Sequence, residues 1–330
     1  MTAALDGCAS PLSQTYDVAL LDLDGVVYIG KDAAPYAVDA LVEATQSGMR
    51  TAYLTNNASR APADIAAQLS ALGIAAIADD VVTAAQAAAA LLAERLDADS
   101  AVLVAGAAAL RDAVTEAGLR AVSSADEAPR AVVMGYDPTL DYARLAEAAL
   151  AIRRGALFVA SNLDATLPTA RGPLPGMGSL AALVITATGQ HPVVAGKPER
   201  PLFDQSIART GATRPLVIGD RLDTDIEGAN RSGLPSLLVM TGVSNRLALA
   251  CAPAQRRPTF VAPDLSALFQ PQPASENGHC GEAMAEYDAD ARHVVLRQAG
   301  SEIESLCAIA TAGWAAVDAG QTVLEVVPSE

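Results

Sequence analysis

The feature that most constrains this chain is a short apolar segment that ends in two carboxylates. Residues 18–21 read Val-Ala-Leu-Leu, a continuous apolar run that is typical of a strand buried on both faces of a parallel sheet. Asp22 and Asp24 follow it, and side chains two residues apart on an extended segment point to the same side. Ligands of open α/β sheets bind beyond the carboxyl ends of the strands. We therefore expect both carboxylates to face one small volume at the edge of a sheet.

Two neighbouring carboxylates repel each other unless a positive group lies between them. A hard cation such as Mg²⁺ would remove this repulsion, because it prefers oxygen ligands. One carboxylate could then act as a nucleophile and the other as a general acid and base. An Asp-x-Asp-Gly segment is also a common polar exit from a strand, so these two side chains do not decide the chemistry alone.

Polar side chains suited to phosphate chemistry follow three further predicted strands. They are Thr55 and Asn56 after residues 51–54, Lys197 after residues 193–195, and Asp220 and Asp225 after residues 216–219. A hydroxyl and an amide can donate hydrogen bonds to phosphoryl oxygens, and lysine supplies a point charge suited to phosphate. Taken singly, each group is also an ordinary turn or loop residue. Phosphoryl transfer depends mainly on positioning and charge stabilisation, so the coincidence of all these groups predicts phosphoryl chemistry.

The composition narrows the partners that the chain can have. Its 330 residues include 38 Asp and Glu against 22 Lys and Arg, which gives a formal net charge of -16. Nucleic acid and anionic membrane surfaces both need clustered basic side chains, so neither is expected as a partner. The four cysteines lie far apart without metal-type spacing, which predicts reduced thiols in a cytoplasmic protein. We expect neither a signal peptide nor a membrane-spanning segment.

Predicted strands and helices alternate along most of the chain, which indicates an α/β fold with a doubly wound, mostly parallel sheet. The pattern restarts near Val82 and begins to return at Val193, so a large α/β cap is expected to be inserted into the core. Residues 270–282 are polar, with Pro, Ser, Asn and Gly, which is typical of a linker. The predicted domains are a catalytic core over 1–82 and 193–268, a cap over 83–192, a linker over 269–285 and a small β-α-β appendage over 286–330.

The four motifs together resemble those of the haloacid dehalogenase-like (HAD) hydrolases. They read Asp-Leu-Asp-Gly-Val-Val-Tyr from Asp22, Leu-Thr-Asn-Asn-Ala-Ser-Arg from Leu54, Gly-Lys-Pro-Glu-Arg-Pro-Leu-Phe from Gly196 and Ile-Gly-Asp-Arg-Leu-Asp-Thr-Asp from Ile218. The insertion, with residues 160–164 and 174–179, is similar to the cap of the subclass IIA phosphatases. That branch contains glycerol 3-phosphate, phosphoglycolate, pyridoxal and nitrophenyl phosphatases. One departure is Ala58, where many relatives carry a small polar residue.

The resemblance implies a role for each matching residue. Asp22 would be the nucleophile that becomes an aspartyl phosphate. Asp24 would protonate the leaving alkoxide and then activate the water that hydrolyses this intermediate. Thr55 and Lys197 would bind the phosphoryl group, helped by the main chain near Asn56.

The resemblance also implies a Mg²⁺ cofactor, with Mn²⁺ and Co²⁺ as substitutes. Asp22, the backbone carbonyl of Asp24 and the side chain of Asp220 would hold the ion. Asp225 would hold these ligands in position without binding the ion itself.

The resemblance implies that the core hydrolyses a small phosphomonoester and that the cap chooses which one. Candidate cap contacts are Asn162, Asp164 and Arg171, although these side chains could equally satisfy their own loop or face solvent. A bulky cap favours small substrates, and glycerol 3-phosphate is the expected one. The alternatives are 2-phosphoglycolate, pyridoxal phosphate, and transfer of the phosphoryl group to an acceptor other than water. The expected partner is thus a small phosphorylated metabolite, and a homodimer is left open.

The C-terminal residues carry a second, partial resemblance. A strand at 293–296, the turn Arg297-Gln298-Ala299-Gly300-Ser301-Glu302, a helix over 302–319 and a strand at 322–327 are similar to the coenzyme A-binding core of GNAT acetyltransferases. In that family the turn presents backbone N–H groups to a pyrophosphate. Glu302 replaces the small residue expected there and would repel the anion, so a structural or regulatory appendage is the favoured interpretation.

Overall fold

The computed structural model describes residues 4–167, 169 and 171–328, and the chain falls into two compact units. The first unit comprises Met1–Tyr53, Leu69–Ala75 and Thr210–Glu330, and the second comprises Leu54–Gln68 and Ala76–Arg209. The helices α3 (Pro62–Ala71) and α8 (Pro201–Thr210) lie where the chain passes from one unit to the other. Within the described residues, no helix has the length and apolar character needed to span a membrane.

The central sheet of the first unit has the strand order β16, β15, β14, β2, β5. Strand β14 pairs in parallel with β15 and with β2, and β15 pairs in parallel with β16. The apolar runs at residues 18–21 and 216–218 form the adjacent central strands, and their side chains are almost fully buried. This confirms the doubly wound α/β fold that the alternation of segments predicted. The strands are β2 (Val18–Asp22), β5 (Arg50–Thr55), β14 (Pro215–Gly219), β15 (Ser236–Val239) and β16 (Phe260–Ala262).

Short elements complete the central part of the first unit. A hairpin of β3 (Tyr28–Ile29) and β4 (Asp32–Ala33) follows β2 directly. The helices are α1 (Leu12–Thr15), α2 (Ala37–Gln46), α9 (Glu227–Ser232) and α10 (Arg246–Ala250). Asn245 caps α10, because its side-chain oxygen accepts a hydrogen bond from the N–H of Ala248.

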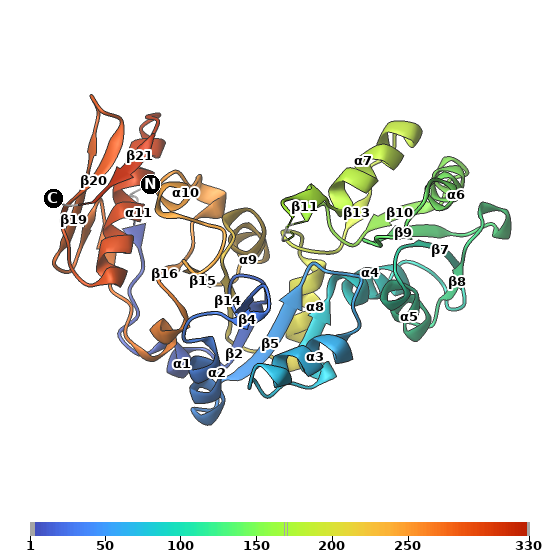
Figure 1. The fold of residues 1–330 in the computed structure, drawn as a ribbon, viewed down its shortest axis with the longest axis horizontal. Coiled ribbons are helices and arrows are strands. Elements are labelled where there is room, and N and C mark those ends of the chain that lie inside the picture. The colour runs from blue at the N-terminus through green and yellow to red at the C-terminus, as the bar shows by residue number, and fades with distance from the viewer. Residues whose placement is uncertain (1–3, 168, 170, 329–330) are drawn as a thin grey trace. The chain divides into compact units, whose positions relative to one another are not determined.

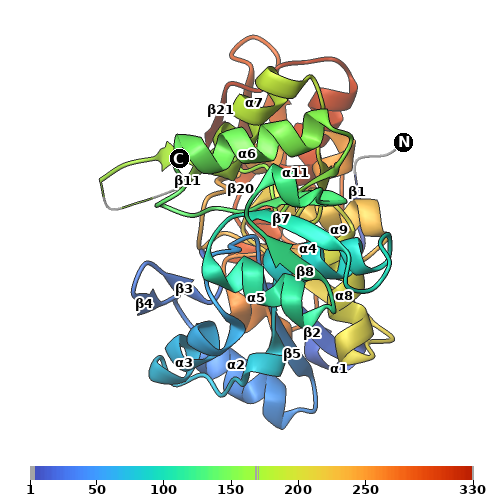
Figure 2. The same ribbon diagram turned by 90° about the vertical axis from the view of Figure 1, so that its right-hand side faces the viewer.

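The second unit is built on a parallel sheet with the order β13, β10, β9, β7, β8. The helices α6 and α7 lie on one face of this sheet, and α4 and α5 lie on the other (Figure 1, Figure 2). Ile152 of α6 and Val184 of α7 pack in one core cluster with strand residues Leu103, Val132 and Phe158. The elements are β6 (Val81–Thr83), α4 (Ala84–Ala93), β7 (Ala101–Ala105), α5 (Ala108–Glu116), β8 (Arg120–Val122), β9 (Ala131–Met134), α6 (Tyr142–Arg153), β10 (Leu157–Ala160), β11 (Thr166–Leu167), β12 (Leu174–Pro175), α7 (Met177–Thr188) and β13 (Val193–Val194).

The strand predicted at residues 193–195 joins a different sheet from the one expected. Val193 and Val194 pair with Val159 and Ala160 of β10, so β13 is an edge strand of the second unit's sheet. The sequence had predicted that this segment begins the return to the first sheet. A run of two or three apolar residues fits the edge of either sheet, so its periodicity carries no information about which sheet it joins.

The C-terminal residues and the N-terminal strand β1 form an α/β layer in the first unit, with the sheet order β1, β17, β18, β19, β20, β21. The helix α11 (Glu302–Asp318) packs against this sheet (Figure 1). The strands are β1 (Ala4–Leu5), β17 (Ser275–Glu276), β18 (His279–Cys280), β19 (Ala283–Asp288), β20 (His293–Gln298) and β21 (Glu325–Val327). The neighbours are antiparallel except for the parallel pair β20–β21.

The segment expected to be a linker, 269–285, instead contains β17, β18 and the start of β19. Its polar residues are used in the packing: the buried hydroxyl of Ser275 donates to the carbonyl oxygen of Cys307 at 3.1 Å. The N–H of Gly278 donates to Oγ1 of the buried Thr311 at 3.0 Å. Partners supplied by a helix some 30 residues later cannot be read from local composition, and for this reason the linker prediction was wrong.

The helix α11 also packs closely on α10 of the same unit. A Cβ on Gly313 would lie 2.6 Å from Cβ of Ala250, so only glycine fits at this crossing. The indole N–H of the buried Trp314 donates to the carbonyl oxygen of Leu249 at 2.8 Å. The guanidinium of Arg257 lies 5.2 Å from the Trp314 ring centroid and pairs with Asp318 at 2.7 Å.

The turn before α11 is closed by an acidic side chain. Glu304 accepts a hydrogen bond from the N–H of Ser301 at 2.8 Å, and the hydroxyl of Ser301 accepts one from the N–H of Glu304. Hydrogen bonds from the backbone N–H and from the side chain of Ser301 hold the pKa of Glu304 below its usual range. A Cβ on Gly300 would meet the same carboxylate. The helix N-terminus thus already holds an anion of its own, which opposes the binding of a pyrophosphate in the GNAT manner.

Candidate active site

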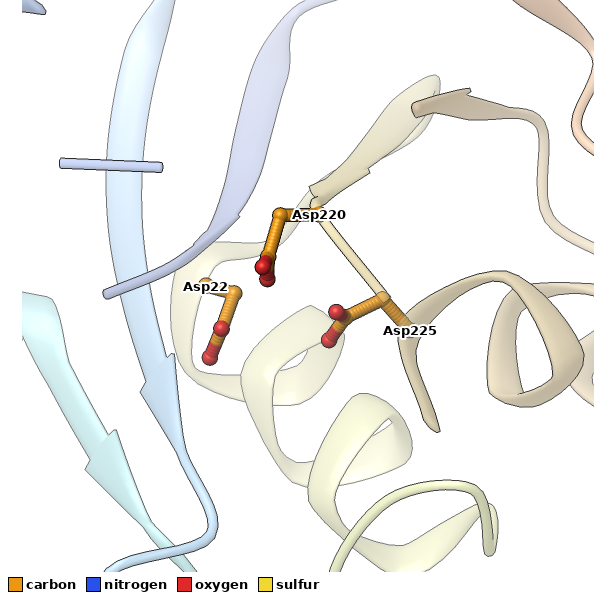
Figure 3. A group of neighbouring side chains, drawn as sticks. All are labelled: Asp22, Asp220 and Asp225. Carbon is orange, nitrogen blue, oxygen red and sulfur yellow. The ribbon is translucent and has the colours of Figure 1, made fainter. Parts of the chain in front are cut away.

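Three acidic side chains of the first unit converge beyond the ends of β2 and β14 (Figure 3). Asp22, Asp220 and Asp225 each offer one carboxylate oxygen, and these oxygens all lie within 4.8 Å of one another. Asp220 and Asp225 are almost fully buried, and Asp22 is half-buried. Carboxylates held this close repel each other unless protons or cations offset their charge. We refer to these residues as the acidic cluster.

The strand pairing explains how distant parts of the chain build the acidic cluster. Asp22 is the last residue of β2, and Asp220 directly follows the adjacent parallel strand β14. Parallel strands end at the same edge of a sheet, so both carboxylates lie at that edge. Asp225 comes from η3 (Leu222–Ile226), a π-helical turn that precedes α9. Turns of this kind occur frequently at functional sites.

The carboxylate of Asp220 is held by the loop after β15. The N–H of Val243 donates to its Oδ2 at 2.6 Å, and the N–H of Ser244 donates to its backbone oxygen at 3.1 Å. A Cβ on Gly242 would lie 2.5 Å from Cγ of Asp220. The backbone of this loop therefore approaches the carboxylate so closely that only glycine fits at position 242.

Asp225 is held in a similar way from its own turn. The N–H of Arg221 donates to its Oδ2 at 3.1 Å, and a Cβ on Gly219 would collide with its side chain. The side chain of Arg221 itself pairs with Asp223 at 2.9 Å. Burial raises the pKa of Asp223, but the hydrogen bonds and charge of Arg221 outweigh it and hold this pKa below its usual range.

The donor set of the acidic cluster fits a hard divalent cation. Its ligand atoms are carboxylate oxygens, which Mg²⁺ and Ca²⁺ prefer. Softer ions such as Zn²⁺ favour imidazole and thiolate ligands, and the cluster contains neither. Of the four acidic residues in the predicted metal site, the structure brings together the carboxylates of Asp22, Asp220 and Asp225.

The fourth, Asp24, lies outside the acidic cluster, in the turn after β2 with its side chain exposed. The turn is closed by the N–H of Gly25, which donates to the carbonyl oxygen of Tyr28 at 2.8 Å. Gly25 has a φ of +86°, a conformation that glycine adopts at little cost. The hydroxyl of Thr241 donates to the carbonyl oxygen of Gly25 at 2.5 Å, which joins this turn to the loop that holds Asp220.

The remaining predicted residues lie in the second unit, and most of them are hydrogen-bonded to one another. The side chain of Asn56 accepts a bond from the N–H of Lys197 at 2.8 Å and donates to the carbonyl oxygen of Lys197 at 3.1 Å. It also donates to Oδ2 of Asp164 at 3.1 Å, and its backbone oxygen accepts a bond from Asn162 at 2.7 Å. Thr55, which ends β5, accepts a bond from the N–H of Asn57. Thr55, Lys197 and Asn162 are almost fully buried.

Arg171 is not part of this network, and its side chain is exposed. Its N–H donates to Oγ1 of Thr169 at 3.2 Å, a contact within its own loop. Ala58, the departure from the family pattern, is fully buried, and a Cβ on Gly135 would lie 3.3 Å from its Cβ. A polar side chain at position 58 would therefore need a buried partner.

Sequence reasoning missed the loop after β15. Val243 contributes a backbone N–H to Asp220, and Gly242 contributes only the absence of a side chain. Glycine and a backbone N–H carry no side-chain signature. The only available signal was the polar sequence Thr-Gly-Val-Ser that follows a predicted strand.

Models of known families match two segments of the chain, which together contain the four motifs. A haloacid dehalogenase-like hydrolase model matches residues 19–120, and a HAD-hydrolase-like model matches residues 194–268. The chain is also 49% identical over 259 residues to a D-glycerol 3-phosphate phosphatase of Mycobacterium tuberculosis, across 78% of this chain and 72% of that relative.

Solved structures show the same likeness. A glycerol phosphate phosphatase from Mycobacterium tuberculosis in complex with magnesium superposes with a TM-score of 0.87 at 41% identity, over 97% of this chain and 96% of that chain. A 4-nitrophenylphosphatase from Thermotoga maritima superposes with a TM-score of 0.72 at 29% identity, over 78% of this chain and 97% of that chain.

Proposed function

Because the chain belongs to the haloacid dehalogenase-like hydrolases, we propose that it is a Mg²⁺-dependent phosphatase whose substrate is glycerol 3-phosphate. The observation that carries the proposal is the acidic cluster, in which three carboxylates from the ends of adjacent strands and η3 lie within 4.8 Å. A hydrolase that attacks phosphorus with a carboxylate needs such a group where a cation can offset its charge.

The proposed reaction uses two aspartates in sequence. A carboxylate oxygen of Asp22 attacks phosphorus, the bond from phosphorus to the alkoxide breaks, and Asp24 gives its proton to the leaving oxygen. Asp24 then accepts a proton from water, whose oxygen attacks phosphorus and releases inorganic phosphate from Asp22. An ionised carboxylate needs no activating base, so a histidine partner is not required.

The acidic cluster and the Asp24 turn would hold the cation. Asp22, the backbone carbonyl of Asp24 and the side chain of Asp220 would be its protein ligands, with Asp225 supporting them. When bound, a divalent cation offsets the negative charge that develops on the phosphoryl oxygens. The relative solved with magnesium supports Mg²⁺ as that cation.

Thr55 and Lys197 are proposed to bind the phosphoryl group, as the family motifs imply. A hydroxyl donor and an ammonium group complement its equatorial oxygens. Glycerol 3-phosphate is favoured because a relative 49% identical to this chain is named a D-glycerol 3-phosphate phosphatase. We further propose a cytoplasmic setting, in keeping with the free thiols of the four cysteines.

A screen of small phosphate esters with saturating Mg²⁺ tests the proposed function. We expect glycerol 3-phosphate to give the highest kcat/KM, ahead of 2-phosphoglycolate and pyridoxal phosphate. Asp22→Asn should lower kcat by about a thousandfold or more, equivalent to roughly 4 kcal/mol of transition-state stabilisation. Faster turnover of 2-phosphoglycolate would overturn the substrate, and an active Asp22→Asn variant would overturn the mechanism.

A further inference from the structure

One side-chain amide in the second unit pairs with both backbone polar groups of a single lysine. Oδ1 of Asn56 accepts from the N–H of Lys197 at 2.8 Å, and Nδ2 of Asn56 donates to its carbonyl oxygen at 3.1 Å. A planar amide that makes both bonds fixes the position and the direction of the main chain at residue 197. The direction in which a side chain leaves the backbone is set by the main chain, so the start of the buried Lys197 side chain is fixed as well.

The side-chain amide of Asn56 can make both hydrogen bonds to Lys197 in only one orientation. If its oxygen and nitrogen were exchanged, Nδ2 would face the N–H of Lys197 and Oδ1 would face the carbonyl oxygen, so both bonds would become repulsive. The carboxylate of Asp164 accepts the second hydrogen of Nδ2 at 3.1 Å. A carboxylate accepts hydrogen bonds and does not donate them when ionised, so Asp164 favours the orientation that Lys197 requires.

The surrounding backbone leaves little room for other arrangements. A Cβ on Gly196 would lie 2.5 Å from Oδ1 of Asn56. The side chain of Asn162 donates to the backbone oxygen of Asn56 at 2.7 Å and accepts from the N–H of Asp164 at 3.1 Å. Three chain segments, after β5, after β10 and after β13, are thus joined at this point.

We propose that Asn56 and Asp164 are positioning residues that act in series on Lys197. Asp164 fixes the orientation of the Asn56 amide, and the amide fixes the main chain of Lys197. This assignment rests on the proposed role of Lys197 in binding the phosphoryl group. It gives Asp164 a different task from direct contact with the substrate, because its carboxylate acts through the amide of Asn56.

The test measures the affinity for a phosphoryl group in matched variants. The probes are competitive inhibition by inorganic phosphate and KM for 4-nitrophenyl phosphate. Asn56→Ala and the isosteric Asn56→Asp should each weaken phosphate inhibition by about tenfold, as loss of a supporting hydrogen bond commonly does. Asp164→Ala should act in the same direction. Asp164→Asn keeps an oxygen that can accept the same bond and should stay within about threefold of the unaltered protein.

The double variant separates a chain of two residues from two independent contacts. In the Asn56→Ala background, Asp164→Ala should add no more than about a twofold further loss, because the amide that it orients is already absent. Losses that multiply would show that Asp164 acts on the substrate separately and would overturn the proposal. So would phosphate inhibition that is unchanged in Asn56→Asp.

Asn230→Ala is the matched control for the loss of a hydrogen-bonded asparagine. Its side chain donates to the carbonyl oxygens of Gln255 and Arg257 in the first unit. We expect it to lower the melting temperature without changing phosphate inhibition. If the unaltered protein hydrolyses no phosphate ester, the proposed function fails. If it is active and the Asn56 and Asp164 variants bind phosphate as well as it does, only the positioning assignment fails.

Discussion

The residue with the sharpest steric demand near the acidic cluster is Gly242. Its φ lies outside the left-handed region, so glycine is required there by space and not by backbone conformation. Any side chain at this position would push against the carboxylate of Asp220, which the N–H of Val243 holds at 2.6 Å. The position of one proposed metal ligand therefore depends on the absence of a single methyl group.

Gly242→Ala should weaken Mg²⁺ binding by about tenfold to a hundredfold, the range typical when a ligand's supporting contacts are disturbed. Titration calorimetry with Mg²⁺ measures the dissociation constant independently of turnover. Gly118→Ala is the control, since Gly118 has a φ of +79° and open space around it. It should cost roughly 1 kcal/mol of stability and leave Mg²⁺ binding unchanged. Unaltered Mg²⁺ affinity in Gly242→Ala would contradict the steric argument.

At this scale the sequence predicted the acidic cluster because its members follow apolar strands that could be recognised locally. Asp22 and Asp220 needed only the rule that parallel strands end at one edge. The residues that hold these carboxylates in place could not be predicted from the sequence. The contacts of Gly242 and Val243 with Asp220 depend on the loop after β15 lying beside β14. The pairing of Asn56 with Lys197 likewise joins residues 141 positions apart.

Among the elements, the starts of three strands are joined by Asp17. Its carboxylate accepts bonds from the N–H of Thr213 and of Arg214 at 2.9 Å each, next to the start of β14. Its backbone oxygen accepts from the N–H of Arg50, where β5 begins. Burial raises the pKa of Asp17, but the hydrogen bonds from Thr213 and Arg214 outweigh it and hold this pKa below the ordinary value of 3.8.

This shift has a defined sign for stability. A carboxyl group with a lowered pKa in the folded state adds stability above its unfolded pKa, and the contribution is lost as the pH falls through the folded value. At pH 7 and pH 5, Asp17→Asn should lower the free energy of unfolding by about 1 kcal/mol. The difference from the unaltered protein should shrink below about pH 4. Urea unfolding at several pH values measures it.

Thr213→Val serves as the companion variant, because it removes one donor and keeps the carboxylate. It should lose part of the same stability with the same dependence on pH. A difference between Asp17→Asn and the unaltered protein that persists unchanged to pH 3 would show that the carboxylate charge is not what joins the strands.

The elements themselves were predictable where the apolar pattern was long or well bounded. Residues 18–21 and the helix at 302–319 appear close to their expected bounds as β2 and α11. The strands β17 and β18 were missed because each has two residues, and they pair with β1, with each other and with β19. Two-residue strands have no measurable period, so only tertiary contacts define them.

Within the first unit as a whole, the C-terminal layer is continuous with the core. Gly313 and Trp314 of α11 fit against α10, and the buried Leu249 and Ala250 lie beneath them. The match to the Thermotoga maritima phosphatase covers 97% of that protein but only 78% of this chain. About a fifth of this chain therefore has no counterpart in that protein.

Removal of all residues after Phe269 should therefore destabilise the remaining protein. It would expose Leu249 and Ala250 to water and leave β1 without its neighbour β17. We expect the melting temperature to fall by at least about 10 °C, or the product to aggregate. Gly313→Val in the full chain should give a smaller loss, about 1–3 kcal/mol, by overpacking the same contact. A truncated protein that melts at the original temperature would contradict this account.

The pairing of β1 with β17 sets an order of events during synthesis. Leu5 leaves the ribosome early, yet its partner Ser275 is translated about 270 residues later. Until then the backbone groups of β1 have no strand to bond with, while the central sheet can already assemble. The strand β1 is therefore among the last parts of the nascent polypeptide to pair. A bulky fusion next to β1 would hinder this late step of folding.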